Sequence, residues 1–151
     1  MVPTMMIMGN IDNANLLFLE KKFTHAITEY AQILDDDPTN PIALNNIGYA
    51  LTKIKKFNDA LEYYEKSLQI NPDDQIVLVN KISLFRKTGR FEDAIKICNK
   101  ILDVKPNELI VLYHKLRLLK KLNRHEESNE ICKKILGIYP NNIEIQNELI
   151  K

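Results

Sequence analysis

Four prolines divide this chain at equal intervals of 34 residues: Pro38, Pro72, Pro106 and Pro140. Proline lacks a backbone donor and disfavours helical geometry in the residue before it, so regularly spaced prolines mark the same boundary in successive copies of a repeat. Repeats of about 20 to 50 residues are typical of stacked supersecondary units, because one copy alone cannot bury its apolar face. The spacing therefore predicts a repeat protein.

The segment before each proline has the pattern of one amphipathic helix. A small residue is followed four positions later by a tyrosine or a cysteine, which places both side chains on one helical face. A small side chain at this point lets a neighbouring helix approach closely. The pairs are Ala26 and Tyr30, Ala60 and Tyr64, Ala94 and Cys98, and Ser128 and Cys132.

A second helical series occupies the first half of each repeat, where apolar residues recur at helical spacing, as at Leu44, Ile47 and Leu51. We therefore expect two helices per repeat, the second ending near its proline. Between paired helices we expect a left-handed residue, for which Gly and Asn are favoured and which strains a lysine modestly. The residues at this position are Lys21, Lys55, Gly89 and Asn123.

The period, the small and aromatic positions and the prolines together resemble the tetratricopeptide repeat, a helix-turn-helix unit of 34 residues. The resemblance covers residues 7–142 and is strongest over residues 41–74, although Leu44 replaces the usual tryptophan. In the first repeat, Asn10 and Asn13 stand where the family has apolar residues. The matching positions within residues 41–74 are Leu44, Ile47, Gly48, Leu51, Ala60, Tyr64, Ser67 and Pro72.

The resemblance implies an all-α fold, a right-handed superhelical solenoid of antiparallel helix pairs that forms one repeat domain over residues 1–151. The expected repeats cover residues 7–40, with a degenerate first helix, and residues 41–74, 75–108 and 109–142. Residues 143–151 are expected to form a partial capping helix, or the start of a longer array, and they end in the apolar pair Leu149 and Ile150. An apolar end favours stacking of one copy on another.

Composition argues for a cytoplasmic protein. Hydrophobic residues make up 45% and charged residues 27%, the net charge is +1, and no apolar run approaches the ~18 residues of a membrane span. The methionine-rich N-terminus lacks the basic residues and apolar length of a secretory signal. We expect Cys98 and Cys132 to be buried and unpaired, because equivalent helices lie about 10 Å apart and a disulfide allows roughly 7 Å between Cα atoms.

The chain lacks the patterns of catalytic and metal sites, so we expect neither an enzyme nor a bound cofactor or metal. Its four glycines are too far apart to cradle a phosphate. His25, His114 and His125 occupy different repeat positions, and none has a second metal ligand at the required spacing on one helix. No serine has a base that the sequence identifies.

Charge is distributed unequally between the two helical series. The first helices of the second to fourth repeats, residues 41–54, 75–88 and 109–122, contain no Asp or Glu and carry several lysines and arginines. The second helices carry acidic residues, for example Glu62, Glu92 and Glu126. A net charge near zero therefore hides two surfaces of opposite sign.

In the tetratricopeptide fold the first helices line the concave side, so the resemblance implies a basic groove. Asparagine amides pair with peptide backbone, tyrosines offer amphipathic contact, and cations select acidic side chains or a terminal carboxylate. We therefore predict a noncatalytic protein-interaction module that binds an acidic or polar peptide segment. The predicted groove residues are Asn15, Asn45, Asn46, Tyr49, Lys53, Asn80, Ser83, Arg86, Lys87, Tyr113, His114, Arg117, Lys120 and Lys121.

Some of these residues also have a purely structural explanation. A lysine near a helix C-terminus interacts favourably with the helix dipole, and either tyrosine can pack between repeats. The dipole accounts for Lys53, Lys87, Lys120 and Lys121 without a ligand. The most informative residues are then the two arginines, the two tyrosines and the asparagines.

A chaperone-tail clamp is not expected. Tetratricopeptide domains that bind the C-terminal Glu-Glu-Val-Asp of heat-shock chaperones use lysine, asparagine and arginine at five defined positions. Those positions hold Ile11, Asn15, Asn46, Ile76 and Asn80 or, one repeat later, Asn45, Tyr49, Asn80, Ile110 and His114. Neither set supplies the required cations.

Two other functions are compatible with the same pattern. Related helical-repeat solenoids bind RNA, but the near-neutral charge and the scarcity of aromatic residues among the cations argue against nucleic acid as the partner. The other alternative is a self-assembling scaffold joined through its repeat ends, in which the groove is incidental. Light scattering at two protein concentrations distinguishes a scaffold from a monomeric adaptor.

Overall fold

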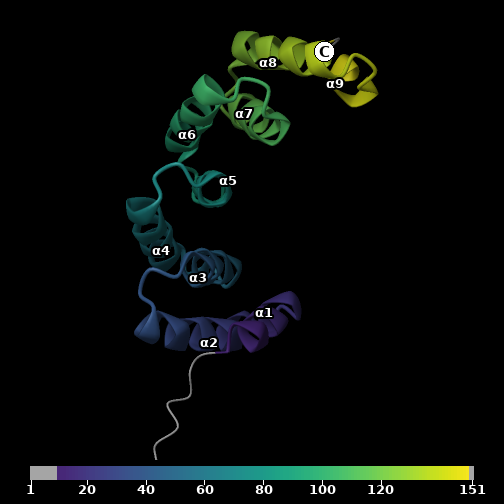
Figure 1. Ribbon diagram of the computed structural model, residues 1–151. Helices are drawn as coiled ribbons and strands as arrows, with labels where there is room; N and C mark the ends of the chain where they lie inside the picture. The colour runs from purple at the N-terminus through teal and green to yellow at the C-terminus, as the bar shows by residue number, and fades with distance from the viewer. Residues whose placement is uncertain (1–9, 150–151) are drawn as a thin grey trace, which may run out of the picture. The chain divides into compact units, whose positions relative to one another are not determined.

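The computed structural model describes residues 10–149, and the regular secondary structure in this range is entirely helical. Figure 1 shows the helices in chain order, joined by short turns. This confirms the predicted all-α class. The helices are α1 (Ile11–Leu19), α2 (Phe23–Asp36), α3 (Pro41–Lys53), α4 (Phe57–Ile70), α5 (Gln75–Lys87), α6 (Phe91–Val104), α7 (Leu109–Lys121), α8 (His125–Ile138) and α9 (Ile143–Leu149).

The chain forms two compact units. Unit 1 ends at Asn80 and unit 2 begins at Lys81, so α5 contributes residues to both. In unit 1, α1 packs on α2, α2 on α3 and α3 on α4; in unit 2, α6 packs on α7, α7 on α8 and α8 on α9. Each of these helices therefore contacts its neighbours in sequence, as stacked helix pairs do. The predictions for the methionine-rich N-terminus, for a repeat starting at residue 7 and for Ile150 lie outside the described residues.

Prolines and side-chain caps set the helix boundaries. Helices α2, α4, α6 and α8 each end two residues before one of the four prolines, as predicted. At the start of α3, the side chain of Asn40 accepts a hydrogen bond from the backbone N–H of Ala43, and Asp74 and Asn142 cap the starts of α5 and α9 in the same way. Asn10 does the same for α1, accepting from Asp12 and Asn13. This explains the departure at Asn10 from the family pattern, because here the residue is the cap that starts the helix.

The turn inside each helix pair contains the predicted left-handed residue. The φ angle is 60° at Lys21, 64° at Lys55, 75° at Gly89 and 56° at Asn123. In each turn the next residue donates its backbone N–H to a carbonyl five residues earlier, for example Lys56 to Leu51 at 2.9 Å. This is the hydrogen bond of a Schellman motif, which satisfies a carbonyl at the helix end. The expectation of left-handed geometry at all four positions is confirmed.

Replacing Lys55 by glycine is expected to stabilise the protein by about 0.5–1 kcal/mol. A left-handed conformation costs an L-residue about 1–2 kcal/mol, and the greater freedom of glycine in the unfolded chain offsets about 0.4–1 kcal/mol of the gain. Urea unfolding followed by circular dichroism measures the change. The matched control is Gly89→Ala, which should destabilise, since φ at Gly89 is +75° and no atom lies within 4 Å of the added methyl group. A neutral result for both variants would contradict this explanation.

The core is built from the predicted small and aromatic pairs. Ala26, Ala60 and Ala94 are fully buried, and so are the rings of Tyr30 and Tyr64, which lie one turn after the first two alanines. In unit 2 the equivalent positions, one turn after Ala94 and Ser128, hold the two cysteines. Cys98 and Cys132 are buried and free, as predicted.

Candidate functional site

The predicted groove residues lie on α1, α3, α5 and α7, and the structure brings some of them together in each unit. Four are exposed, namely Lys53, Lys87, Arg117 and Lys121. The other ten are half-buried: Asn15, Asn45, Asn46, Tyr49, Asn80, Ser83, Arg86, Tyr113, His114 and Lys120.

In unit 1 the four asparagines form a single hydrogen-bonded network with Tyr30. Asn80 donates to Asn45 (2.8 Å) and Asn45 donates to Asn46 (3.2 Å). Asn46 donates to the Tyr30 hydroxyl (2.8 Å), which in turn donates to Asn15 (2.5 Å). An amide nitrogen that gives one hydrogen to this network retains a second, so the row of amides keeps donors for another molecule.

The Tyr30 hydroxyl is the centre of this network because it both donates and accepts. Burial raises its pKa above the ordinary 10.0, against the opposing effect of the hydrogen bond from Asn46. The hydroxyl therefore stays protonated at neutral pH and continues to donate to Asn15. Sequence reasoning assigned Tyr30 to the core and the asparagines to a binding surface, but it did not predict that they contact one another.

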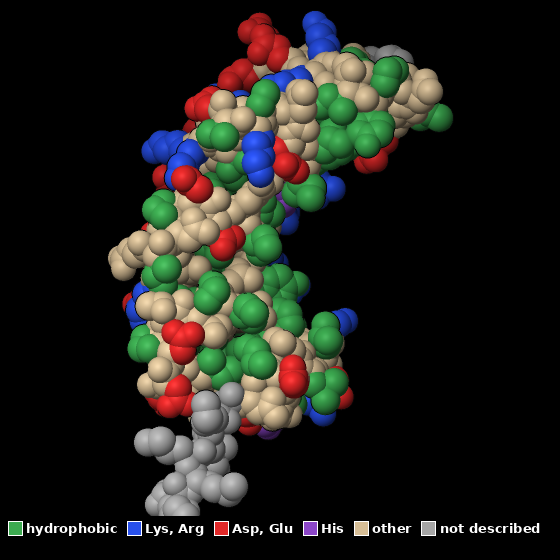
Figure 2. Space-filling model, viewed as in Figure 1, with side chains coloured by type: hydrophobic (Ala, Val, Ile, Leu, Met, Phe, Trp, Pro, Cys, Tyr) green, Lys and Arg blue, Asp and Glu red, His purple; other side chains and the backbone are tan. Residues whose placement is uncertain are grey.

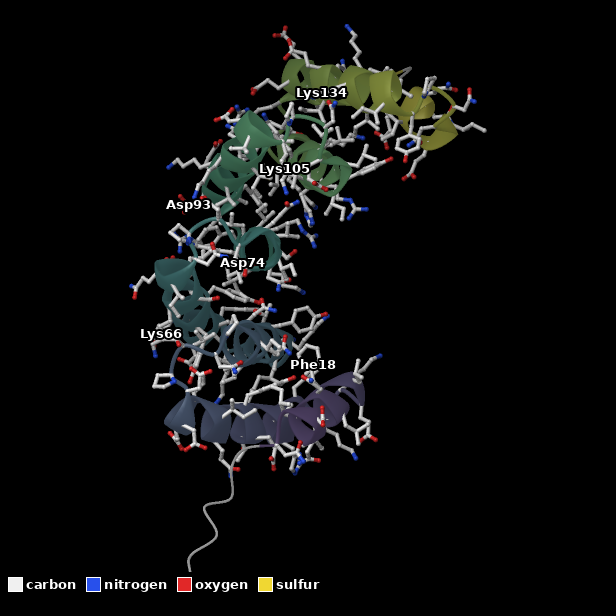
Figure 3. The ribbon with its side chains drawn as sticks, viewed as in Figure 1. Phe18, Lys66, Asp74, Asp93, Lys105 and Lys134 are labelled. Atoms are coloured by element: carbon white, nitrogen blue, oxygen red, sulfur yellow. The ribbon has the colours of Figure 1, made fainter. Side chains whose placement is uncertain are left out.

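A pocket of about 320 Å³ lies beside this network, lined by Phe18, Leu19, Lys21, Phe23, Tyr49 and Lys53. Phe18 lies on α1 and faces α3 (Figure 3), where its ring packs against Tyr49 with 5.3 Å between the ring centroids. The ammonium group of Lys53 lies 4.9 Å from the centre of the Tyr49 ring. Of the lining residues, only Tyr49 and Lys53 were predicted. Phe18 and Phe23, the aromatic residues on either side of the Lys21 turn, are the sequence feature that could have predicted the rest of this pocket.

In unit 2 a pocket of about 390 Å³ is lined by four cations and by no acidic residue: Arg86, Arg117, Lys120 and Lys121. We call it the basic pocket. All four were predicted, one on α5 and three on the last part of α7. Lys120 also forms an ion pair with Glu148 of α9, so part of its charge is already neutralised.

Two nitrogens near the basic pocket are buried and have no hydrogen-bond partner within the described residues, Nε of Arg86 and Nδ1 of His114. Burial lowers the pKa of His114 below its ordinary 6.5, and the charges of Arg86 and Arg117 lower it further. The imidazole is therefore neutral at pH 7 and adds no fifth cation. Buried polar atoms are rarely left unsatisfied in proteins, so these two are candidates for contact with a bound molecule.

The remaining predicted residues of unit 2 have different surroundings. The hydroxyl of Tyr113 accepts a hydrogen bond from Asn142, which joins α7 to the cap of α9. Ser83 and Lys87 lie on the same helix as Arg86 but do not line the basic pocket. The structure thus brings four of the predicted cations together and places Tyr113 in a contact between helices.

Acidic side chains of the second helices pair with arginines of the turns. Arg124 contacts both Glu92 of α6 (3.1 Å) and Glu127 of α8 (2.6 Å), and Arg90 contacts Asp93 (2.8 Å). Figure 2 shows red and blue side chains close together over α6 and α8. These exposed pairs contribute little to stability.

Neither a metal cluster nor a membrane span is found within residues 10–149. No group of three or more His, Cys, Asp or Glu side chains in this range lies close enough together to hold a metal ion. No helix in it combines the length and the apolar character needed to cross a bilayer.

Comparison with known proteins agrees with this architecture. Two family models, both described as tetratricopeptide repeat, match residues 41–74 and residues 110–142. A tetratricopeptide repeat protein from Parabacteroides merdae superposes with a TM-score of 0.83 at 21% identity, over 91% of this chain and 55% of that protein. No curated protein sequence matches significantly.

The MamA protein is similar as well, with a TM-score of 0.79 at 19% identity over 92% of this chain and 76% of MamA. A MamA RS-1 double mutant has the same TM-score at 15% identity, over 91% and 78% of the two chains. At these identities the likeness is one of fold, and it confirms the helical-repeat solenoid class. This chain spans only about half of the Parabacteroides protein, 55% of its length.

Proposed function

We propose that this chain, whose residues 41–74 and 110–142 match tetratricopeptide repeat models, is a protein-interaction module that binds an acidic or polar peptide segment of a partner protein without catalysing a reaction. The binding residues are those predicted on the first helices. The basic pocket is the observation that carries this proposal, because its lining has four cations and no acidic residue, and three of these cations remain to attract and orient a carboxylate beside the Lys120–Glu148 ion pair. The repeat boundaries and the cytoplasmic location predicted from the sequence remain predictions.

Unit 1 would contribute to the same function by a different chemistry. Its asparagine row offers amide donors and acceptors to an extended backbone, which carries one donor and one acceptor per residue. The pocket beside it, lined by Phe18, Phe23 and Tyr49, fits an apolar side chain of a peptide bound to unit 1. A preformed site of this kind costs little conformational entropy on binding.

Reversing two charges of the basic pocket is expected to weaken acidic-peptide binding by at least about tenfold. Losing one hydrogen bond to a charged group costs about 1.5–3 kcal/mol, and about 1.4 kcal/mol corresponds to tenfold in affinity. The variant is Arg117→Glu with Lys121→Glu, both exposed and hence of small effect on stability. Fluorescence anisotropy with a labelled peptide of alternating glutamate and glycine measures the affinity over a range of salt concentrations, and the variant should also show a flatter salt dependence.

The matched control reverses two exposed lysines on α8, Lys133→Glu with Lys134→Glu. It changes the net charge equally and should leave the affinity within about twofold at physiological salt, where distant charges are screened. Equal losses in both variants would mean that the peptide senses only net charge, and the assignment to the basic pocket would be wrong. A large fall in melting temperature for the first variant would mean that these cations hold the fold.

The two alternative functions have separate readouts. A labelled single-stranded RNA that binds more tightly than the glutamate peptide, and only to the wild-type pocket, would favour RNA as the partner. Self-assembly is favoured by the exposed apolar side chains of Tyr139 and Ile143, which are 55% and 69% accessible near the start of α9. Light scattering that shows mass rising with concentration would favour the scaffold.

A further inference from the structure

The basic pocket contains more cationic donors than one carboxylate can satisfy. A carboxylate carries one charge and two oxygens. The pocket presents two guanidinium groups, each with donors in a planar fork, and two ammonium groups. Even with Lys120 shared with Glu148, three cations remain for the bound group. The lining therefore fits an anion with more charge and more oxygens than a glutamate or aspartate side chain.

We propose that the basic pocket binds the phosphate group of a phosphorylated serine or threonine in the partner peptide, an inference that rests on the proposed function. A phosphate monoester carries a charge of about −1.5 to −2 at pH 7 and three strong acceptor oxygens. Arginine is the residue best suited to it, because the guanidinium fork donates two parallel hydrogen bonds to adjacent phosphate oxygens. Arg86 and Arg117 supply two such forks from two different helices.

The buried nitrogens give a second and independent reason. Nε of Arg86 is shielded from solvent and lacks an acceptor within the described residues, although the residue lines the pocket. A phosphate oxygen would supply the missing acceptor, and because three oxygens are available, it would do so while the others contact Arg117 and Lys121. His114 lies close enough to both arginines for their charges to lower its pKa, so its neutral ring borders the same anion.

Bound phosphate should therefore change the protonation of His114. The groups that face this region are Arg86 from α5, the three α7 cations of the pocket, and Glu148 from α9 through Lys120. The two arginines now disfavour the imidazolium, and a dianion between them offsets that effect. The pKa of His114 should rise when the phosphopeptide binds.

The test compares three labelled peptides that differ at one central residue, phosphoserine, glutamate or serine, by fluorescence anisotropy at one fixed salt concentration. We expect the phosphoserine peptide to bind at least about tenfold more tightly than the glutamate peptide, and the serine peptide to bind most weakly. Arg117→Lys keeps the charge but removes the fork of an exposed side chain, and Arg86→Lys does the same at the half-buried position. Each should weaken binding of the phosphoserine peptide by a larger factor than binding of the glutamate peptide, so that the preference for phosphate over carboxylate falls.

The outcomes separate this inference from the proposed function. Equal affinity for the phosphoserine and glutamate peptides would overturn the phosphate assignment and leave acidic-peptide binding intact. No binding of any peptide would overturn both. A competition experiment adds inorganic phosphate or a phosphorylated RNA at the same concentration of phosphate groups as the phosphoserine peptide. If either one competes as strongly as the peptide does, the pocket does not recognise the peptide around the phosphate, and the phosphopeptide assignment is overturned. A phosphopeptide that binds without moving the His114 resonance in a proton NMR titration would place the phosphate outside the pocket.

Discussion

Replacing Gly48 by alanine is expected to lower the free energy of unfolding by about 1–3 kcal/mol, the usual cost of overpacking a core. A methyl group added at Gly48 would lie 2.6 Å from Cε1 and 2.8 Å from Cδ1 of Tyr64. The Tyr64 ring is 1% exposed, so other residues surround it on nearly all sides. The substitution also gains about 1 kcal/mol of helix propensity, so a net loss means that the clash outweighs this gain.

A double-mutant cycle isolates this contact. Tyr64→Ala alone should cost about 3–5 kcal/mol, because it leaves a cavity in place of a buried aromatic ring. In the Tyr64→Ala background there is no ring to clash with, so adding Gly48→Ala should be neutral or stabilising by up to about 1 kcal/mol. Urea unfolding of the four proteins gives the coupling energy. Additive losses would show that Gly48 is needed for a reason other than the approach of Tyr64.

Raising the pH above about 9 is expected to destabilise the protein steeply. Burial raises the pKa of the Cys98 thiol from its ordinary 9.0 to about 12, and burial raises the pKa of Tyr64 from 10.0 to about 12. Burial also raises the pKa of Cys132. Between the unfolded and folded pKa values, the folded protein holds a proton that the unfolded chain has released, so stability falls as pH rises, by up to about 1.4 kcal/mol per pH unit for each group.

The order of the ordinary pKa values makes the prediction specific. Between pH 9 and 10 the loss should come from the cysteines, and above pH 10 Tyr64 should add to it. A variant with Cys98→Ala and Cys132→Ala should therefore have nearly constant stability from pH 9 to 10 and a falling one above that. Urea unfolding at closely spaced pH values measures both curves. Parallel curves for the wild type and the variant would mean that the thiols do not govern the alkaline limit.

The sequence determined the local structure because each local feature depends on residues close together in the chain. The prolines at 34-residue spacing ended four helices, and the left-handed turns formed at Lys21, Lys55, Gly89 and Asn123 as predicted. The pairs of small and aromatic residues predicted the buried faces. The distribution of charge predicted all four cations of the basic pocket, since it follows from which helix each residue belongs to.

The tertiary structure decided which side chains meet. Asn15, Tyr30 and Asn46 belong to three helices, and their hydrogen bonds exist only because α1 and α3 both pack on α2. The pocket formed by Phe18, Phe23 and Tyr49 arises in the same way. The nearness of Arg86 to His114 likewise depends on how α5 and α7 come together, and each of these residues has a buried nitrogen without a hydrogen-bond partner among the described residues. Local sequence sets the period and the face of each helix, but contacts between helices depend on angles and distances that no single segment encodes.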